Sequence, residues 1–96
     1  MKLRHAAALA LVGWYLMMPP TSPPNSFTIN EAAPLSKWYL IESFDSAESC
    51  KRALAEKGSA ASDRFDTAPG EFQRFEVRAW VRSQCIASDD PRLKEK

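Results

Sequence analysis

The sequence predicts an α+β fold: a small strand-helix-strand domain, cross-linked by one disulfide and preceded by an N-terminal hydrophobic helix. Three observations lead to this prediction. An apolar run follows a basic N-terminus, two segments of strand-like alternation flank one helical segment, and the only two cysteines lie in the helical and the second alternating segment. The chain then divides into a signal peptide or membrane anchor (1–20), a proline-rich spacer (21–34) and a small α+β domain (35–96).

The first segment starts with Lys2, Arg4 and His5 and continues with apolar or small residues from Ala6 to Met18. A basic start followed by an apolar run is typical of segments that direct a chain to a membrane. An apolar run of about 7–15 residues suits a cleavable signal peptide, whereas the absence of a small-residue cleavage site after Met18 favours an uncleaved anchor through residues 3–20. Both interpretations place residues 21–96 outside the cytoplasm: periplasmic and anchored to the inner membrane, or periplasmic or secreted after cleavage.

The spacer contains three of the seven prolines and no periodic apolar pattern, so we expect it to be extended. The domain behind it has only about 60 residues and buries a correspondingly small share of its surface. Without Lys2 and Arg4, eleven basic residues remain against twelve acidic ones. A chain with this charge balance offers no basic face for nucleic acid.

The only cysteines are Cys50 and Cys85, in a chain expected to reach an oxidising compartment. Their separation of 35 residues differs from a C-x-x-C redox motif, and two cysteines are too few for a zinc site. We therefore predict a structural disulfide, which in the chain-entropy model stabilises the domain by roughly 3.5–4 kcal/mol.

Residues 37–44 are rich in aromatic and branched side chains and predict a strand. Asp45 is expected to cap the helix that follows, because Glu48 stands three residues later. The helix is predicted over residues 46–57, up to Gly58, with Cys50 on its inward stripe.

Residues 59–70 have the serine, aspartate, proline and glycine content of a loop. The segment 74–85 alternates apolar and polar residues and predicts a second strand with Cys85 on its apolar face. An alternative stays open at this point: a helix that starts near Thr67 and runs to about Arg78, followed by a strand over residues 80–87.

The tail contains the adjacent carboxylates Asp89 and Asp90, followed by Pro91. A calcium loop would need six or more oxygen ligands spread over about a dozen residues. We therefore interpret Asp90 as the cap of a short terminal turn, with Pro91 at its first position, and expect no metal site.

The only histidine, His5, lies in the leader, so the exported part has no imidazole for the commonest hydrolase and metal-site designs. Nominal catalytic candidates are Ser36 with Lys37, and Glu42 with Glu76, but no nucleophile elbow or phosphate loop accompanies them. We expect no enzymatic activity, no catalytic residue and no cofactor.

Three segments carry a resemblance to a group of short bacterial exported proteins without a characterised function: GWYLMMPP, KWYLIESFDSAESC and CIASDDPRLK. Together they cover about a third of the chain. The resemblance implies that these three segments belong together, with a variable stretch such as residues 59–80 between them. It transfers no catalytic or binding residue.

The expected function is therefore a non-catalytic interaction module of the bacterial envelope. The candidate contact residues for an envelope protein are Tyr39, Arg78, Trp80 and Arg82, because aromatic and arginine side chains are enriched at interfaces. For Trp80, cation-stacked cover of the sheet is the competing interpretation. Two other functions stay open: a structural or stress-related envelope protein without a specific ligand, and a thiol redox sensor.

Overall fold

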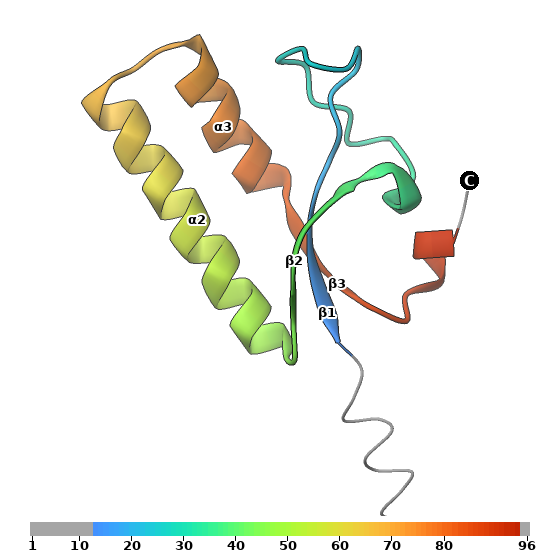
Figure 1. Cartoon of the computed structure of the whole chain (residues 1–96). Helices are drawn as coiled ribbons and strands as arrows, with labels where there is room; N and C mark the ends of the chain where they lie inside the picture. The colour runs from blue at the N-terminus through green and yellow to red at the C-terminus, as the bar shows by residue number, and fades with distance from the viewer. Residues whose placement is uncertain (1–12, 95–96) are drawn as a thin grey trace, which may run out of the picture.

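Three antiparallel strands and two long helices form the described part of the chain, residues 13–94, in the computed structural model (Figure 1). In chain order the elements are β1 (Trp14–Met18), the 3-10 helix η1 (Leu35–Lys37), β2 (Tyr39–Phe44), α2 (Ala47–Thr67), α3 (Glu71–Arg82), β3 (Gln84–Ala87) and the 3-10 helix η2 (Pro91–Lys94). The predicted α+β class is confirmed, and so is the Cys50–Cys85 disulfide.

The central strand of the sheet is β1, which lies between β2 and β3 in the order β2-β1-β3. The sequence places these residues in an apolar leader helix, and the structure corrects this for Trp14–Met18. A leader and a central strand are hard to distinguish in the sequence for a physical reason. A central strand that is covered on both faces is an almost continuous apolar run, and so is the hydrophobic part of a leader. Residues 1–12 of the predicted leader lie outside the described residues, so its cleavage or anchoring stays a prediction.

One face of the sheet packs on α2. Leu16 of β1 is fully buried and lies opposite Cys85 of β3 in the strand register. Cys85 is joined to Cys50, which is also fully buried, near the start of α2. The disulfide therefore ties the long helix to an edge strand across the buried centre of this face.

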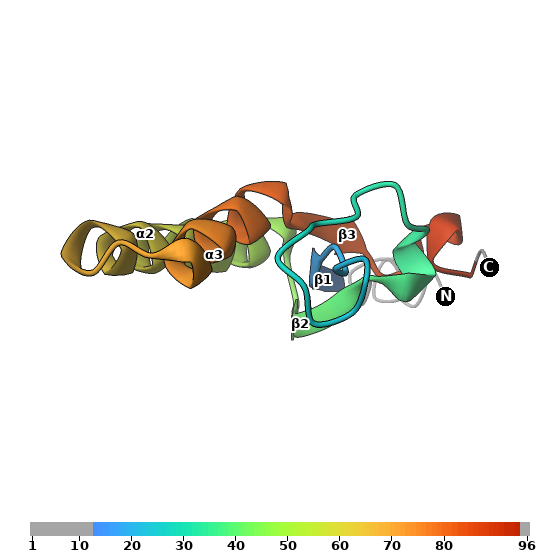
Figure 2. The ribbon, with the colours of Figure 1, turned by 90° about the horizontal axis from the view of Figure 1, so that it is seen from above.

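The other face carries a separate small core. Met17 and Ile86 follow Leu16 and Cys85 in their strands and so point to the opposite side of the sheet. They form a buried cluster with Leu35 and Trp38 from the η1 region. Seen from above, the sheet lies between the helix pair on one side and the two 3-10 helices on the other (Figure 2).

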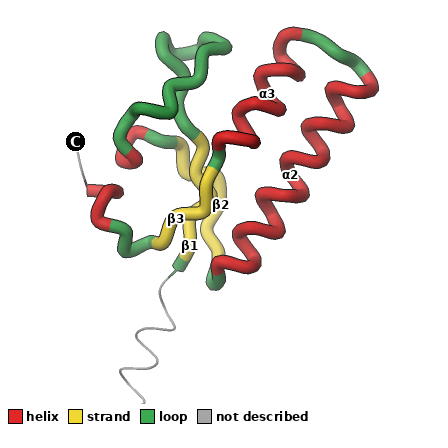
Figure 3. Tube along the Cα trace, turned by 180° about the vertical axis from the view of Figure 1, so that it is seen from behind, coloured by secondary structure: helices red, strands yellow, loops and turns green. Residues whose placement is uncertain are grey.

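The helix α2 is longer than predicted. Ser46, and not Asp45, is its N-cap: the Ser46 hydroxyl accepts a hydrogen bond from Ser49 N–H at 3.1 Å. The expected loop over residues 59–70 is wrong up to Thr67, because the helix continues to that residue. Tertiary contact overrides the weak local propensity, since α2 and α3 pack side by side with Ala61 fully buried (Figure 3).

The predicted strand over residues 74–85 is also wrong for most of its length. Glu71–Arg82 form α3, and only Gln84–Ala87 form a strand, which is close to the alternative of a helix followed by a short strand. Helix α3 contacts α2 and also the loop that precedes η1. Because α3 packs on more than one side, it carries apolar residues on more than one side. In the sequence, apolar residues spread around a helix in this way look like the alternating pattern of a strand.

The prediction of an extended spacer over residues 21–34 is wrong: the segment forms a loop that turns back on itself. Thr21 and Ile29 form an isolated antiparallel bridge, and Asn30 N–H donates to Pro20 C=O at 2.8 Å. Asn25, near the tip, has a φ of 66°, a left-handed conformation that asparagine tolerates better than most residues. The turn brings residues 27–31 against α3.

The C-terminal turn is confirmed. Asp90 precedes η2, and its Oδ1 accepts a hydrogen bond from Arg92 N–H at 2.9 Å. The Arg92 guanidinium also binds this carboxylate, with Nη2 at 2.8 Å from Oδ2. The side-chain hydrogen bond from Arg92, followed by that from its backbone N–H, lowers the pKa of Asp90.

Candidate functional site

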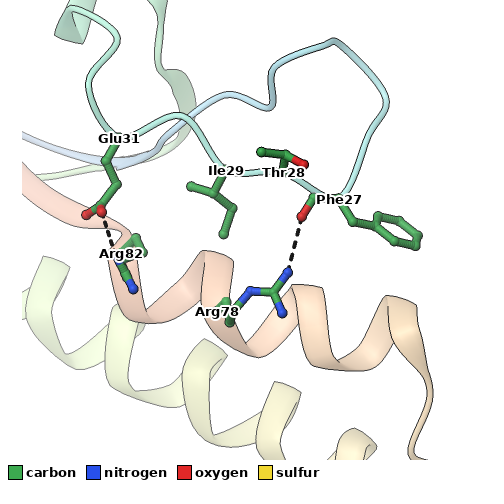
Figure 4. A pocket seen from close by; sticks show the side chains of 6 residues that line it. All are labelled: Phe27, Thr28, Ile29, Glu31, Arg78 and Arg82. Atoms are coloured by element: carbon green, nitrogen blue, oxygen red, sulfur yellow. Dashed lines mark hydrogen bonds and ion pairs between the residues drawn. The ribbon is translucent and has the colours of Figure 1, made fainter.

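A cavity of about 300 Å³ lies between the turned-back loop and α3 (Figure 4). The loop and the helix each contribute polar groups to its wall. The lining residues are Phe27, Thr28, Ile29 and Glu31 from the loop and Arg78 and Arg82 from α3. We refer to this feature as the loop-α3 cavity.

The two arginines reach the cavity because they stand four residues apart on α3 and so share one side of the helix. Arg82 Nη1 forms an ion pair with Glu31 Oε1, and both side chains are about half exposed. Arg78 Nη2 donates to the Phe27 backbone C=O at 3.1 Å. Figure 4 shows Ile29 between these two contacts, with its side chain directed toward the helix.

Among the described residues, Arg78 has no acidic partner, whereas Arg82 has one. Within residues 13–94, no carboxylate forms an ion pair with Arg78. A guanidinium has five N–H donors, and the bond to Phe27 C=O occupies one nitrogen of the three. Arg78 is thus held in place by one hydrogen bond while most of its donor capacity stays open to an incoming group.

An aromatic cluster adjoins the cavity through Phe27. The ring of Phe27 stacks on that of Phe75 with centroids 5.2 Å apart, and Phe72 lies 6.2 Å from Phe27. Two members are strongly exposed for aromatic side chains: Phe27 at 38% and Phe72 at 53%. An exposed aromatic surface next to an arginine is the combination that recurs at the centres of protein interfaces.

The groups that line the cavity are suited to binding a charged or polar partner group. The cavity lining contains cations, one carboxylate, a hydroxyl and apolar side chains. In the part of the chain that the structure describes, no group of three or more histidine, cysteine, aspartate or glutamate side chains is placed to hold a metal ion. The arrangement fits recognition of an anionic group that has an apolar neighbour.

The predicted contact residues do not form one patch. Arg78 and Arg82 lie together in the cavity, whereas Trp80 is on the side of α3 that faces α2. There the Trp80 ring lies 5.9 Å from Lys57 Nζ, so the cation contact of the competing interpretation is present, but between two helices and not over the sheet. Tyr39 is half exposed on β2, away from α3.

The loop side of the cavity was not predicted from the sequence. Phe27 and Ile29 are the only large apolar residues of the predicted spacer, and they stand two positions apart. That spacing was a usable signal of a segment that packs against something. The three prolines around this pair hide the signal, because prolines are typical of exposed spacers.

A second cavity of about 330 Å³ lies at the turn between α2 and α3, lined by Asp63, Arg64, Thr67, Ala68 and Gln73. Its arginine already has an acidic partner, because Arg64 binds Glu76 through two hydrogen bonds. The loop-α3 cavity is therefore the stronger candidate for a binding site.

Comparison of the chain with protein-family models, with curated proteins and with solved structures finds no significant match. No helix among residues 13–94 is long and apolar enough to cross a membrane.

Proposed function

We propose that this chain is a non-catalytic interaction module of the bacterial envelope, which binds another protein through the loop-α3 cavity and its aromatic cluster. The observation that carries the proposal is the exposure of Phe72 and Phe27 beside Arg78, which has no ion-pair partner among the described residues. Aromatic and arginine side chains are enriched at protein-protein interfaces, where burial of the rings and new hydrogen bonds to the guanidinium contribute to affinity.

The disulfide supports the envelope as the location. Structural disulfides persist in oxidising compartments, and the Cys50–Cys85 bond joins two elements of the same small domain. Cys50 has no exposed surface, which favours a structural role over a redox sensor because sensor cysteines are solvent-accessible.

A structural envelope protein without a ligand is the competing proposal, and the exposed aromatics argue against it. A small domain that only has to persist gains nothing from Phe72 left 53% exposed next to an open cavity. Such exposure favours a partner that covers the cluster.

The test compares Phe72→Ala with Val81→Ala in the full chain. Both residues are exposed on α3, at 53% and 72%, but only Phe72 belongs to the aromatic cluster. The variants are cross-linked in envelope preparations of the source organism. The amount of a specific cross-linked protein should fall at least about tenfold in Phe72→Ala, because interface aromatics often contribute 2 kcal/mol or more. Val81→Ala should retain it.

Two results would contradict the proposal. One is the absence of any cross-linked protein that Phe72→Ala reduces. The other is a Phe72→Ala variant that loses partner and thermal stability together, because the phenylalanine would then support the fold.

A further inference from the structure

We propose that the loop-α3 cavity recognises a carboxylate side chain of a partner polypeptide, with an apolar side chain next to it covering the Phe27–Phe72 surface. This inference rests on the proposed interaction function and adds the chemistry of the partner. It follows from the charge of the cavity, from its size and from the surface beside it.

The charge of the cavity favours an anion. Its lining has two guanidinium groups and one carboxylate, and Glu31 already neutralises Arg82. One positive charge is left, on Arg78, and the bond to Phe27 C=O holds the position of that guanidinium. Arginine binds carboxylates through paired N–H donors, and these charge-assisted bonds are about twice as strong as neutral ones.

The neighbouring ion pair shows that this surface accommodates a carboxylate. Glu31 reaches Arg82 from the loop across the cavity, one helical turn from Arg78 (Figure 4). A second carboxylate that enters from solvent beside Ile29 would meet Arg78 as Glu31 meets Arg82.

The size of the cavity points to a side chain of a polypeptide. Its volume of about 300 Å³ is at the lower limit of sites for small molecules, and both arginines that line it are exposed. A cavity of this size holds one or two side chains of a bound segment. The aromatic surface at its edge then takes the next apolar side chain of the same segment.

An anionic membrane surface fits these observations less well than a polypeptide does. Attraction to anionic lipid needs a cluster of about four to eight basic residues. The α3 helix has three arginines, of which Arg82 is paired, and it also carries Glu71 and Glu76. The chain as a whole has a formal charge of only +1.

The test is an NMR titration of the full chain with two matched peptides, acetyl-Ala-Glu-Phe-Ala-amide and the same peptide with Gln in place of Glu. We expect the Glu peptide to shift the Arg78 Nε–Hε signal and the Phe27 ring signals, with a dissociation constant at least about tenfold lower than that of the Gln peptide. Arg78→Ala should abolish this preference. Arg52→Ala is the control, because Arg52 is an exposed arginine of α2 that does not line the cavity.

Three results would overturn the inference. The two peptides could bind equally, the shifts could map outside the cavity, or neither peptide could bind while vesicles with anionic lipid shift the Arg78 signal. If an envelope protein is captured through Phe72 but its binding does not depend on Arg78, the proposed function stands and the carboxylate inference fails.

Discussion

Arg64 of α2 and Glu76 of α3 form a two-pronged ion pair that links the two helices. Arg64 Nε lies 3.0 Å from Glu76 Oε1, and Arg64 Nη2 lies 2.6 Å from Oε2. The hydrogen bond to Glu76 raises the pKa of Arg64. The pair lies in the part of α2 beyond Lys57 for which the sequence predicts a loop, so it contributes to the helical state of that part.

Glu76→Gln should therefore lower the Tm by about 2–5 °C, because the bidentate geometry is lost while the side-chain volume is kept. The loss should shrink in 1 M salt, which screens exposed charges. Thermal unfolding followed by circular dichroism measures both effects. Glu56→Gln, on the exposed surface of α2, is the control, and an equal loss in both variants would show that the Arg64–Glu76 pair has no special role.

Leu16→Ala should lower the free energy of unfolding by about 2–5 kcal/mol, since Leu16 is fully buried in the central strand. Leu40→Ala, at a residue 54% exposed on β2, should cost less than about 1 kcal/mol. Urea unfolding of both variants makes the comparison. If Leu16→Ala left stability unchanged, residues 14–18 would belong to a leader and not to the domain.

Removing the disulfide by the double substitution Cys50→Ala with Cys85→Ala should cost about 3–4 kcal/mol, because the bond closes a loop of 35 residues in the unfolded chain. The wild-type protein in strong reductant should approach the stability of this variant. Denaturant unfolding with and without reductant tests this. Stability of the wild-type protein that does not respond to reductant would contradict the prediction.

Gly58→Ala should stabilise the protein by about 0.5–1 kcal/mol, because glycine within a helix is less favourable than alanine by about that amount. Space is available: a Cβ at Gly58 would have Trp80 Cβ as its nearest neighbour at 4.0 Å, an ordinary van der Waals contact. Chemical denaturation gives the change directly. A loss of stability would mean that α2 and α3 approach more closely at this point than the structure shows.

The Asp90 carboxyl should titrate below its ordinary value of about 3.9, because Arg92 binds its ionised form. A pKa that is lowered by folding stabilises the folded state above the unfolded pKa, and this contribution is lost as the pH falls through the folded pKa. Side-chain NMR titration measures the midpoint. Arg92→Ala should raise it and Arg52→Ala should not, and an unchanged midpoint in Arg92→Ala would exclude the guanidinium as the cause.

Local sequence signals predicted several elements because the decisive contacts there are close in the chain or chemically specific. The β2 region is predicted by its aromatic and branched residues, and the C-terminal turn by Asp90 and its neighbouring proline. The pairing of Cys50 with Cys85 needs no structural knowledge, because they are the only cysteines.

The tertiary structure decided what local patterns leave ambiguous. Apolar residues at Trp14–Met18 suit a leader or a central strand, and only pairing with strands from far along the chain distinguishes the two. Residues 59–67 are helical because α3 packs against them. The alternation in α3 combines apolar residues packed on two sides of the helix with Val81, which is exposed. The loop-α3 cavity joins residues about 50 positions apart, such as Phe27 and Arg78, and no local pattern encodes a contact at that distance.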